Sequence, residues 1–317
     1  MYLCAPMREL SELNEAQFDA VTNIRGPVMI IAGPGSGKTR VLTYRIAYLI
    51  RNDIDPFRIM ALTFTNKASA EMRERIAHIV GSEAKNLYMG TFHSVFARIL
   101  RAEAHRMGYP NNFTIYDPDD AKSLLKTIIK EEGLNDKIYK PNIVYYRISS
   151  AKNALLDAKK YRENAEMMAD DEASQRPKIA DLYAKYQERC FKAGAMDFDD
   201  LLLKMYELLI RFPDVLYKYQ QRFSHLLIDE FQDTNYAQYE IVKMLAAQHE
   251  NVCVVGDDAQ SIYAFRGATI ENILNFERDY PDLKVFKLEQ NYRSTEHIVS
   301  AANAIIKHNR GQLPKVI

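Results

Sequence analysis

A glycine-rich turn between an apolar strand and a helix is the feature that most limits what this chain can fold into. The run Val28–Ala32 is short, apolar and β-rich, and a helical pattern over 38–51 follows the turn. Glycines let backbone N–H groups point inward without Cβ clashes, and a helix N-terminus adds partial positive charge. This context predicts a phosphate-binding loop, although Ala32 stands where the common pattern has glycine. Its residues are Gly33, Pro34, Gly35, Ser36, Gly37, Lys38 and Thr39.

The last two residues of this loop carry the chemistry. In such loops the lysine reaches the β- and γ-phosphates of a nucleotide, and the hydroxyl that follows it ligates Mg²⁺. We therefore expect Lys38 to bind phosphate and Thr39 to bind the metal.

Apolar runs alternate with helical patterns along the rest of the chain. Near-continuous apolar strands joined by helices indicate a buried parallel sheet, so the predicted fold class is α/β with helices flanking the sheet. The further strands are expected at 59–63, 87–91, 225–229, 252–256 and 284–288, and further helices at 66–80, 93–107, 236–248 and 295–307.

Residues 118–223 differ, because apolar residues there recur almost throughout at helical spacing. We interpret 117–195 as an all-helical insertion, whose end stays open because 197–212 can pack on either part. Within it, 137–162 is basic and interleaved with tyrosines, and 163–172 is acidic. The basic stretch is either a solvated helix face or a strip that contacts a phosphate backbone.

Composition excludes several classes of protein. With 47% hydrophobic and 26% charged residues, the chain is neither disordered nor a coiled coil. No apolar run approaches the ~20 residues of a membrane span, and the N-terminus does not resemble a signal peptide. Three distant cysteines fit neither a disulfide framework nor a zinc site. The chain has 42 basic and 42 acidic residues, so its net charge gives no argument for nucleic-acid binding. Equal totals do not exclude local basic patches on the surface.

A second motif, an acidic pair, adds to the chemistry predicted for the phosphate loop. Asp229 and Glu230 directly follow the apolar strand residues Leu226–Ile228. Asp229 is placed to hold Mg²⁺, and Glu230 to orient or deprotonate an attacking water. Together with the phosphate loop, the pair predicts Mg²⁺-dependent nucleotide hydrolysis rather than the reaction of a small-molecule kinase.

Eight ordered motifs extend this pattern over nearly the whole chain, and together they resemble the superfamily 1 UvrD/PcrA/Rep DNA helicases. They are Leu13–Gln17, Gly33–Thr39, Leu62–Ala68, Gly90–Ser94, Asp197–Leu201, Ile228–Thr234, Gly256–Tyr263 with Phe265–Ala268, and Leu288–Ser294.

The resemblance implies a RecA-like domain in two parts, 1–116 and 196–290, around the insertion 117–195. Residues 291–317 would begin a second RecA-like domain, so the chain resembles an N-terminal fragment of a longer helicase. It further implies a cytoplasmic, nucleoid-associated bacterial protein, a monomer that acts on single-stranded DNA and its junctions with duplex, beside repair or replication proteins.

The resemblance also assigns residues to ATP. Gln17 would read the adenine edge, and Tyr292 would stack on the base. Arg40 and Arg293 would face the phosphates, Arg293 as an arginine finger, and Gln260 would sense the γ-phosphate.

On the DNA side the resemblance implies Phe64, Thr91, His93, Tyr263, Phe265 and Arg266. Aromatic rings stack on bases at ~1–3 kcal/mol each. Close relatives usually carry Trp at the position of Phe265, and core packing is the alternative for Phe64 and Phe265.

The family's activity would be ATP-driven 3′ to 5′ translocation and duplex separation in repair or replication. Two alternatives are the helicase subunit of a recombination helicase-nuclease, and a nucleotide- and DNA-binding module without motor action.

Overall fold

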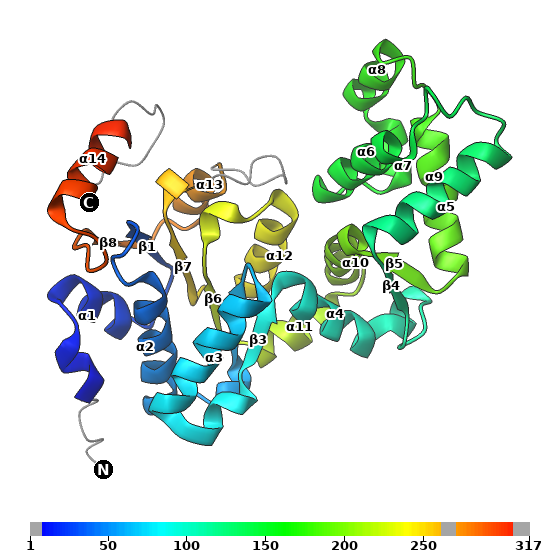
Figure 1. The fold of residues 1–317 in the computed structure, drawn as a ribbon. Coiled ribbons are helices and arrows are strands. Elements are labelled where there is room, and N and C mark those ends of the chain that lie inside the picture. Colours follow the sequence, from blue (N-terminus) through cyan, green and yellow to red (C-terminus); the bar gives the residue numbers. More distant parts are fainter. Residues whose placement is uncertain (1–7, 261–270, 307–317) are drawn as a thin grey trace. The chain divides into compact units, whose positions relative to one another are not determined.

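The computed structural model describes residues 8–260 and 271–306. Contacts divide the chain into two compact units, which are described one at a time (Figure 1). The first unit comprises the described residues of 1–95, 216–235 and 242–317, and the second comprises 96–215 and 236–241. Three helices, α4 (Phe92–Glu103), α11 (Pro213–Arg222) and α12 (Tyr236–Ala246), contribute residues to both units.

The first unit is built on a six-stranded parallel sheet with the order β3-β2-β6-β7-β1-β8. Val28 pairs with Cys253 on one side and with Lys284 on the other, which places β1 inside the sheet. The predicted α/β class with a parallel sheet flanked by helices is thereby confirmed. The strands are β1 (Val28–Ala32), β2 (Ile59–Thr63), β3 (Tyr88–Thr91), β6 (His225–Ile228), β7 (Val252–Gly256) and β8 (Lys284–Leu288).

Both faces of this sheet are covered, which explains why its central strands read as continuous apolar runs. Val28 and Ile30 pack in one core with residues of α2 (Lys38–Arg51) and α3 (Asn66–Val80), which lie side by side (Figure 1). Met29 and Ile31 alternate with them and face Ile273 of α13 (Glu271–Asp279) on the other side.

Two further helices complete the first unit. A capping box at Asn14 starts α1 (Glu15–Thr22), which packs on α2. Near the end of the described chain, α14 (Glu296–Ile306) has no buried residue.

The second unit is mainly helical and has its own apolar core. Tyrosines fill much of this core, among them the fully buried Tyr161, Tyr183 and Tyr186. The segment 197–212, whose packing the sequence left open, lies in this unit, where α10 contacts α6. The unit therefore extends beyond 117–195 on both sides. Its helices are α5 (Pro118–Glu131), α6 (Pro141–Asn153), α7 (Ala158–Glu163), α8 (Ala165–Ala173), α9 (Ile179–Lys192), α10 (Phe198–Arg211) and the start of α11 (Pro213–Arg222).

A small parallel pair of strands in this unit was not predicted. The strands β4 (Thr114–Tyr116) and β5 (Ala195–Asp197) pair in register, Thr114 with Ala195. Each has only three residues, which is too short for a period-two pattern to be read from sequence.

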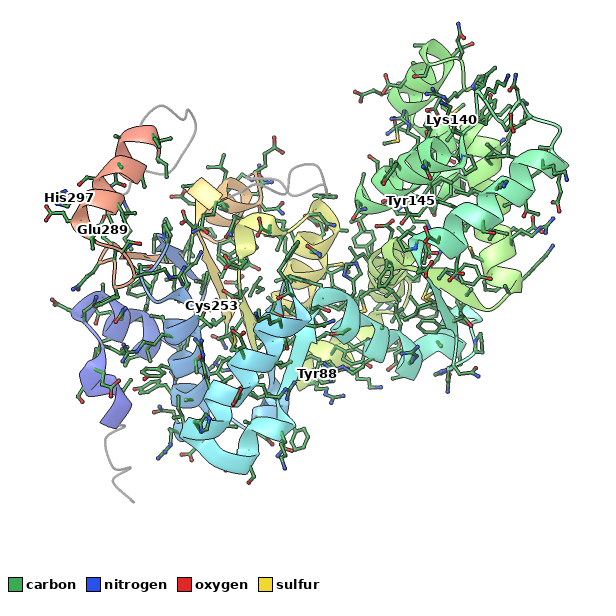
Figure 2. All side chains as sticks on the ribbon, in the orientation of Figure 1. Tyr88, Lys140, Tyr145, Cys253, Glu289 and His297 are labelled. Carbon is green, nitrogen blue, oxygen red and sulfur yellow. The ribbon has the colours of Figure 1, made fainter. Side chains whose placement is uncertain are left out.

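Within the second unit, the basic stretch 137–162 does not form one exposed face. Tyr145 lies on α6 and Lys140 directly precedes that helix (Figure 2), and Lys140 is exposed. Arg147, by contrast, donates to Asp171 across 2.9 Å, and Lys152 is buried. The acidic stretch 163–172 thus neutralises part of the basic one inside the unit, an arrangement that neither interpretation of the sequence anticipated.

Two of the three cysteines lie among the described residues whose thiol state the structure gives. Cys190 and Cys253 are buried free thiols, and Cys253 lies in the central strand β7 (Figure 2). In the described part of the chain, none of the helices combines the length and hydropathy needed to cross a membrane.

Candidate nucleotide-binding site

The predicted site residues of the first unit gather at one edge of the sheet. Because all six strands are parallel, the loops that follow them leave from the same carboxyl edge. The phosphate loop follows β1, Asp229 and Glu230 follow β6, and Gln260 comes shortly after β7. A parallel topology therefore brings together residues that are some 200 positions apart in the chain.

The loop after β1 has the backbone that its glycines permit. Gly35 and Gly37 have φ angles of 76° and 90°, in the left-handed region that favours glycine. Ser36 Oγ donates to the Gly33 carbonyl across 2.7 Å and closes the turn. The first residue of α2 is Lys38, so the N-terminus of that helix faces the loop.

A cleft of about 470 Å³ opens beside this loop, and most of the predicted nucleotide residues line it. Arg75 of α3 also lines it and was missed, because a single arginine on an exposed helix face looks like ordinary surface charge in the sequence. Lining residues are Pro34, Gly35, Gly37, Lys38, Thr39, Arg40, Arg75, Glu230, Gln260, Tyr292 and Arg293.

Lys38 and Glu230 meet inside the cleft. Lys38 Nζ lies 3.1 Å from Glu230 Oε2, and the lysine side chain is only 11% exposed. The backbone of Glu230 has φ 49°, a left-handed conformation that is uncommon for a residue with a side chain. Such outliers cluster at functional sites, where the surrounding structure holds them in place.

Asp229 lies beneath this pair at the end of β6. It is 4% exposed, and its Oδ1 accepts the Glu230 backbone N–H across 3.1 Å. Burial, together with the neighbouring charge of Glu230, raises the pKa of Asp229 to about 7. A bound cation would favour the charged carboxylate instead, so this oxygen donor suits a hard metal ion.

The donor set fits Mg²⁺ held jointly with a nucleotide. Among residues 8–260 and 271–306, three His, Cys, Asp or Glu side chains are nowhere arranged to hold a metal. Mg²⁺ does not need such a cage, because it is usually bound by one or two protein oxygens plus phosphates and water. Thr39 at the start of α2 and Asp229 supply two such oxygens.

Gln17 lies next to the loop but is already engaged. Its Nε2 donates to the Ser36 carbonyl across 2.9 Å, and its Oε1 accepts the Asn14 N–H across 3.3 Å in the capping box of α1. The side chain is 1% exposed. In this conformation Gln17 supports the loop and the start of α1, and it does not itself line the cleft.

The turn after β8 closes the other side of the cleft. Asn291 Nδ2 donates to the Pro34 carbonyl across 2.7 Å, and the Tyr292 N–H donates to the Gly35 carbonyl across 2.9 Å. The ring of Tyr292 is half exposed, and its hydroxyl accepts from Asn14. This position suits stacking on a base at the rim of the cleft.

Besides Arg75, two arginines line the same cleft. Arg293 follows Tyr292 directly, whereas Arg40 extends from α2 and pairs with Glu12 across 2.5 Å. Arg40 therefore reaches a phosphate only by exchanging this exposed partner, which costs little at a solvated pair.

Half of the predicted DNA residues lie at the same sheet edge. Thr63 and Thr91 are partners in register, so Phe64 and Thr91 leave neighbouring strands together, and His93 follows in α4. Burial lowers the pKa of His93, which favours the neutral imidazole at pH 7. The other three, Tyr263, Phe265 and Arg266, fall outside the described residues.

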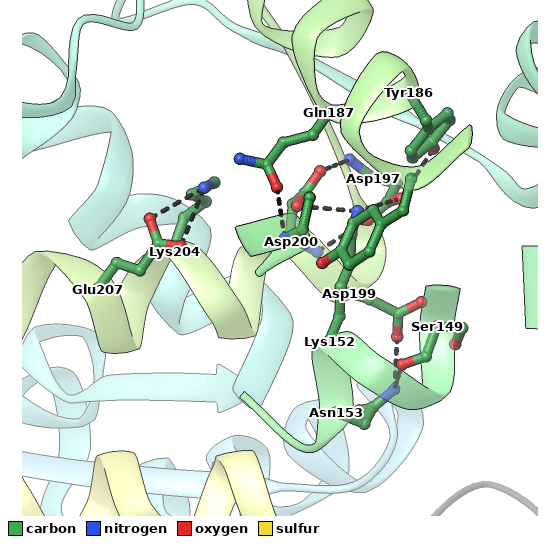
Figure 3. A network of polar contacts seen from close by, with 12 residues as sticks. Ser149, Lys152, Asn153, Tyr186, Gln187, Asp197, Asp199, Asp200, Lys204 and Glu207 are labelled. Carbon is green, nitrogen blue, oxygen red and sulfur yellow. Dashed lines mark hydrogen bonds and ion pairs between the residues drawn. The ribbon is translucent and has the colours of Figure 1, made fainter. Parts of the chain in front are cut away.

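The motif Asp197–Leu201 does not belong to the cleft. In the second unit, Asp197 caps α10 by accepting the Asp200 N–H across 2.8 Å. Its other oxygen accepts from Lys152 at 2.7 Å and from Tyr186 at 2.8 Å (Figure 3). Asn153 donates to Asp199 across 2.9 Å. This motif therefore ties α6, α9 and α10 together.

Comparison with known proteins gives matches over most of the chain. The sequence profile of the UvrD/REP helicase N-terminal domain matches residues 13–281. Over 307 residues the chain is 49% identical to the ATP-dependent DNA helicase PcrA of Staphylococcus epidermidis and 48% identical to that of Staphylococcus aureus. Each match covers 96% of this chain and 41% of the relative, so the chain spans about two fifths of the length of these curated relatives.

Proposed function

The chain belongs to the UvrD/REP helicase family, as its motifs predict, and from that membership we propose that it is the ATP- and single-stranded-DNA-binding portion of a 3′ to 5′ DNA translocase and helicase. The observation that carries the proposal is the convergence of Lys38, Glu230, Gln260 and Arg293 on one cleft beside a phosphate loop. Such an assembly is made to bind and cleave a nucleoside triphosphate.

The binding half of the mechanism follows from the loop. Backbone N–H groups of 35–39 and the N-terminus of α2 attract the phosphates, and Lys38 exchanges Glu230 for phosphate oxygens. Thr39 and Asp229 would hold Mg²⁺, and the bound ion would neutralise negative charge that develops on the phosphates.

The hydrolytic half rests on Glu230. Once Lys38 has turned to the phosphates, the Glu230 carboxylate is released to orient and deprotonate the attacking water. Arg293, which lies against the loop beside Gly35, would place positive charge near the transferring phosphoryl group. Gln260, which lines the same cleft, would respond to the γ-phosphate.

We propose that this cycle of ATP binding and hydrolysis drives motion along DNA. ATP would close the cleft between this RecA-like domain and a second one, and hydrolysis would reopen it, so that DNA contacts on the two domains alternate. Phe64, Thr91 and His93 lie at the same carboxyl edge as the nucleotide cleft, which supports a short connection between the two sites. The substrates would be single-stranded DNA and its junctions with duplex, in repair or replication.

The test is ATP hydrolysis by this chain with Mg²⁺, with and without single-stranded DNA. Turnover that rises with DNA supports a motor domain, whereas binding of both ligands without turnover favours the non-motor alternative. A folded sample that binds neither ligand contradicts the proposal.

Lys38→Ala provides the matched comparison, because it removes the phosphate-binding cation from the loop. We expect nucleotide-dependent activity to be abolished. The control is Lys85→Ala, an exposed lysine that precedes β3 and therefore lies toward the amino edge of the sheet, away from the cleft. Equal losses in the two variants would show that the effect is not specific to the loop.

A further inference from the structure

A buried glutamine links Glu230 to the strand that leads toward the predicted DNA residues. Gln232 is 1% exposed. Its Nε2 donates to Glu230 Oε2 across 2.8 Å, and its Oε1 accepts the backbone N–H of Asp257 across 2.9 Å. One side chain therefore spans from the proposed catalytic carboxylate after β6 to the residue directly after β7.

The space around this bridge is closed. A Cβ added at Gly256, the last residue of β7, would lie 2.8 Å from Gln232 Oε1. That distance is well below van der Waals contact, so only glycine lets the amide sit against the strand.

From Asp257 the connection continues into the nucleotide cleft. Asp257 is fully buried, and its two carboxylate oxygens accept from the Ala259 N–H at 3.1 Å and from Gln260 Nε2 at 2.6 Å. In the sequence Gln260 is followed, within six residues, by Tyr263, Phe265 and Arg266.

A second connection reaches the turn 231–234 from Asn272, which follows the segment 261–270 in the sequence. Asn272 in α13 is fully buried, and its Nδ2 donates to the Thr234 carbonyl across 2.9 Å and to Thr234 Oγ1 across 3.1 Å. Thr234 Oγ1 in turn donates to the Phe231 carbonyl across 2.6 Å.

Residues on both sides of 261–270 are thus bonded to one short turn, 231–234, which directly follows Glu230. We propose that this turn is the element that couples nucleotide binding to DNA binding, and that Gln232 and Asn272 are its positioning residues. The inference rests on the proposed function, because it assumes that the cleft takes ATP and that Tyr263, Phe265 and Arg266 contact DNA.

The proposed turn would link the binding of nucleotide to the binding of DNA. When phosphate draws Lys38 from Glu230, the Glu230–Gln232 bond is the first internal contact to change. Through Asp257 and Asn272 that change reaches both sides of 261–270. By linkage, nucleotide then alters DNA affinity by the same factor as DNA alters nucleotide affinity, typically ~5–150-fold for coupled sites.

The experiment measures this factor directly. The Kd of a fluorescent oligo-dT is determined for the 317-residue chain with and without a Mg²⁺-bound, non-hydrolysable ATP analogue. The coupling factor is the ratio of the two values. It is compared between the unaltered chain, Gln232→Ala, and Asn272→Ala, which removes the donor to Thr234 without placing a charge in the buried site.

A matched control is Gln220→Ala. Gln220 also donates its amide to a backbone carbonyl, that of Met244 across 2.8 Å, but it lies in α11, away from the turn. Its coupling factor should equal that of the unaltered chain.

We expect the coupling factor to fall to about twofold or less in Gln232→Ala and Asn272→Ala, from a starting value of ~5-fold or more, while each ligand alone still binds within about threefold of its original affinity. A merely structural role would weaken both Kd values and leave their ratio unchanged. If Gln232→Ala does not fold, Asn272→Ala alone carries the test.

Two results would overturn the inference. One is an unchanged ratio in the folded variants, and the other is a ratio of one in the unaltered chain while it binds both ligands. Failure of the unaltered chain to bind either ligand is different, because it contradicts the proposed function itself. The two ideas therefore fail separately.

Discussion

The buried lysine of the second unit offers the sharpest test of how that unit is held together. Lys152 is 1% exposed, and its Nζ lies 2.7 Å from Asp197 Oδ2 and 2.9 Å from Asp200 Oδ1. Burial alone would lower its pKa, but the two carboxylates raise it well above its usual value, so the ammonium stays charged. Burial and the charge of Asp197 raise the pKa of Asp200.

Lys152→Met replaces the cation by an apolar side chain of similar length and leaves two buried carboxylates without it. Removing one partner from a buried ion pair costs ~3–5 kcal/mol, because the remaining charge is left uncompensated. At ~1.4 kcal/mol per factor of ten, the folded-to-unfolded ratio should fall ~100- to 3000-fold. Urea denaturation followed by far-ultraviolet circular dichroism measures this change in the free energy of unfolding.

Two further variants separate charge from packing. Lys192→Met removes an exposed lysine from α9 of the same unit and should leave the unfolding curve unchanged. Adding Asp197→Asn and Asp200→Asn to Lys152→Met removes both orphaned charges, while asparagine still caps α10. This triple variant should recover most of the lost stability.

The reasoning is refuted if Lys152→Met costs less than ~1 kcal/mol, well below the cost of an uncompensated buried charge. A triple variant as unstable as Lys152→Met would instead show that shape, rather than charge, dominates at this site.

Three other predictions address the first unit. Gly35→Ala places a Cβ 2.7 Å from Arg293 Cβ and 2.9 Å from Asn291 Oδ1 at a φ of 76°, so we expect a loss of ~1–3 kcal/mol in unfolding free energy and weaker nucleotide binding by titration. Glu230→Gln should bind ATP without hydrolysing it, as single-turnover assays will show, and normal turnover would remove Glu230 from the catalytic role. Burial, then the nearby His249 and Arg45 charges, lowers the pKa of His225 to about 4. Between pH 6.5 and 4 the unfolded chain binds the extra proton, so stability should decline by up to ~3 kcal/mol as the pH falls through that window.

Two of these predictions have a matched comparison. Gly26 also has a positive φ, but a Cβ there meets nothing within 4 Å, so Gly26→Ala should retain nucleotide binding while Gly35→Ala does not. For His225, a His225→Gln variant should show a shallower decline in stability over the same pH window, and an unchanged slope would assign the decline to other groups.

Much of the first unit could be predicted because its determinants are local. A strand buried on both faces is a continuous apolar run, so β1, β6 and β7 were visible as such. The phosphate loop was equally clear, since it depends on consecutive residues, as positive φ at Gly35 and Gly37 shows. Once the sheet was known to be parallel, the meeting of Lys38 with Glu230 followed from the common edge of its strands.

Other features depended on neighbours that no local pattern encodes. Arg75 and an ordinary surface arginine have the same sequence signal, and only the packing of α3 brings Arg75 to the cleft. The basic stretch 137–162 suggested solvent or DNA, yet Lys152 is buried beside a carboxylate 45 positions away.

The sheet, its phosphate loop and the acidic pair could thus be read from consecutive residues, because strand burial and backbone conformation are local properties. That Gln232 bridges Glu230 to Asp257, and that Gln17 already supports the loop, is evident only in the folded structure. A hydrogen bond needs a partner within about 3 Å, and the partner of a buried amide is set by which strands become neighbours, not by which residues are adjacent in the chain.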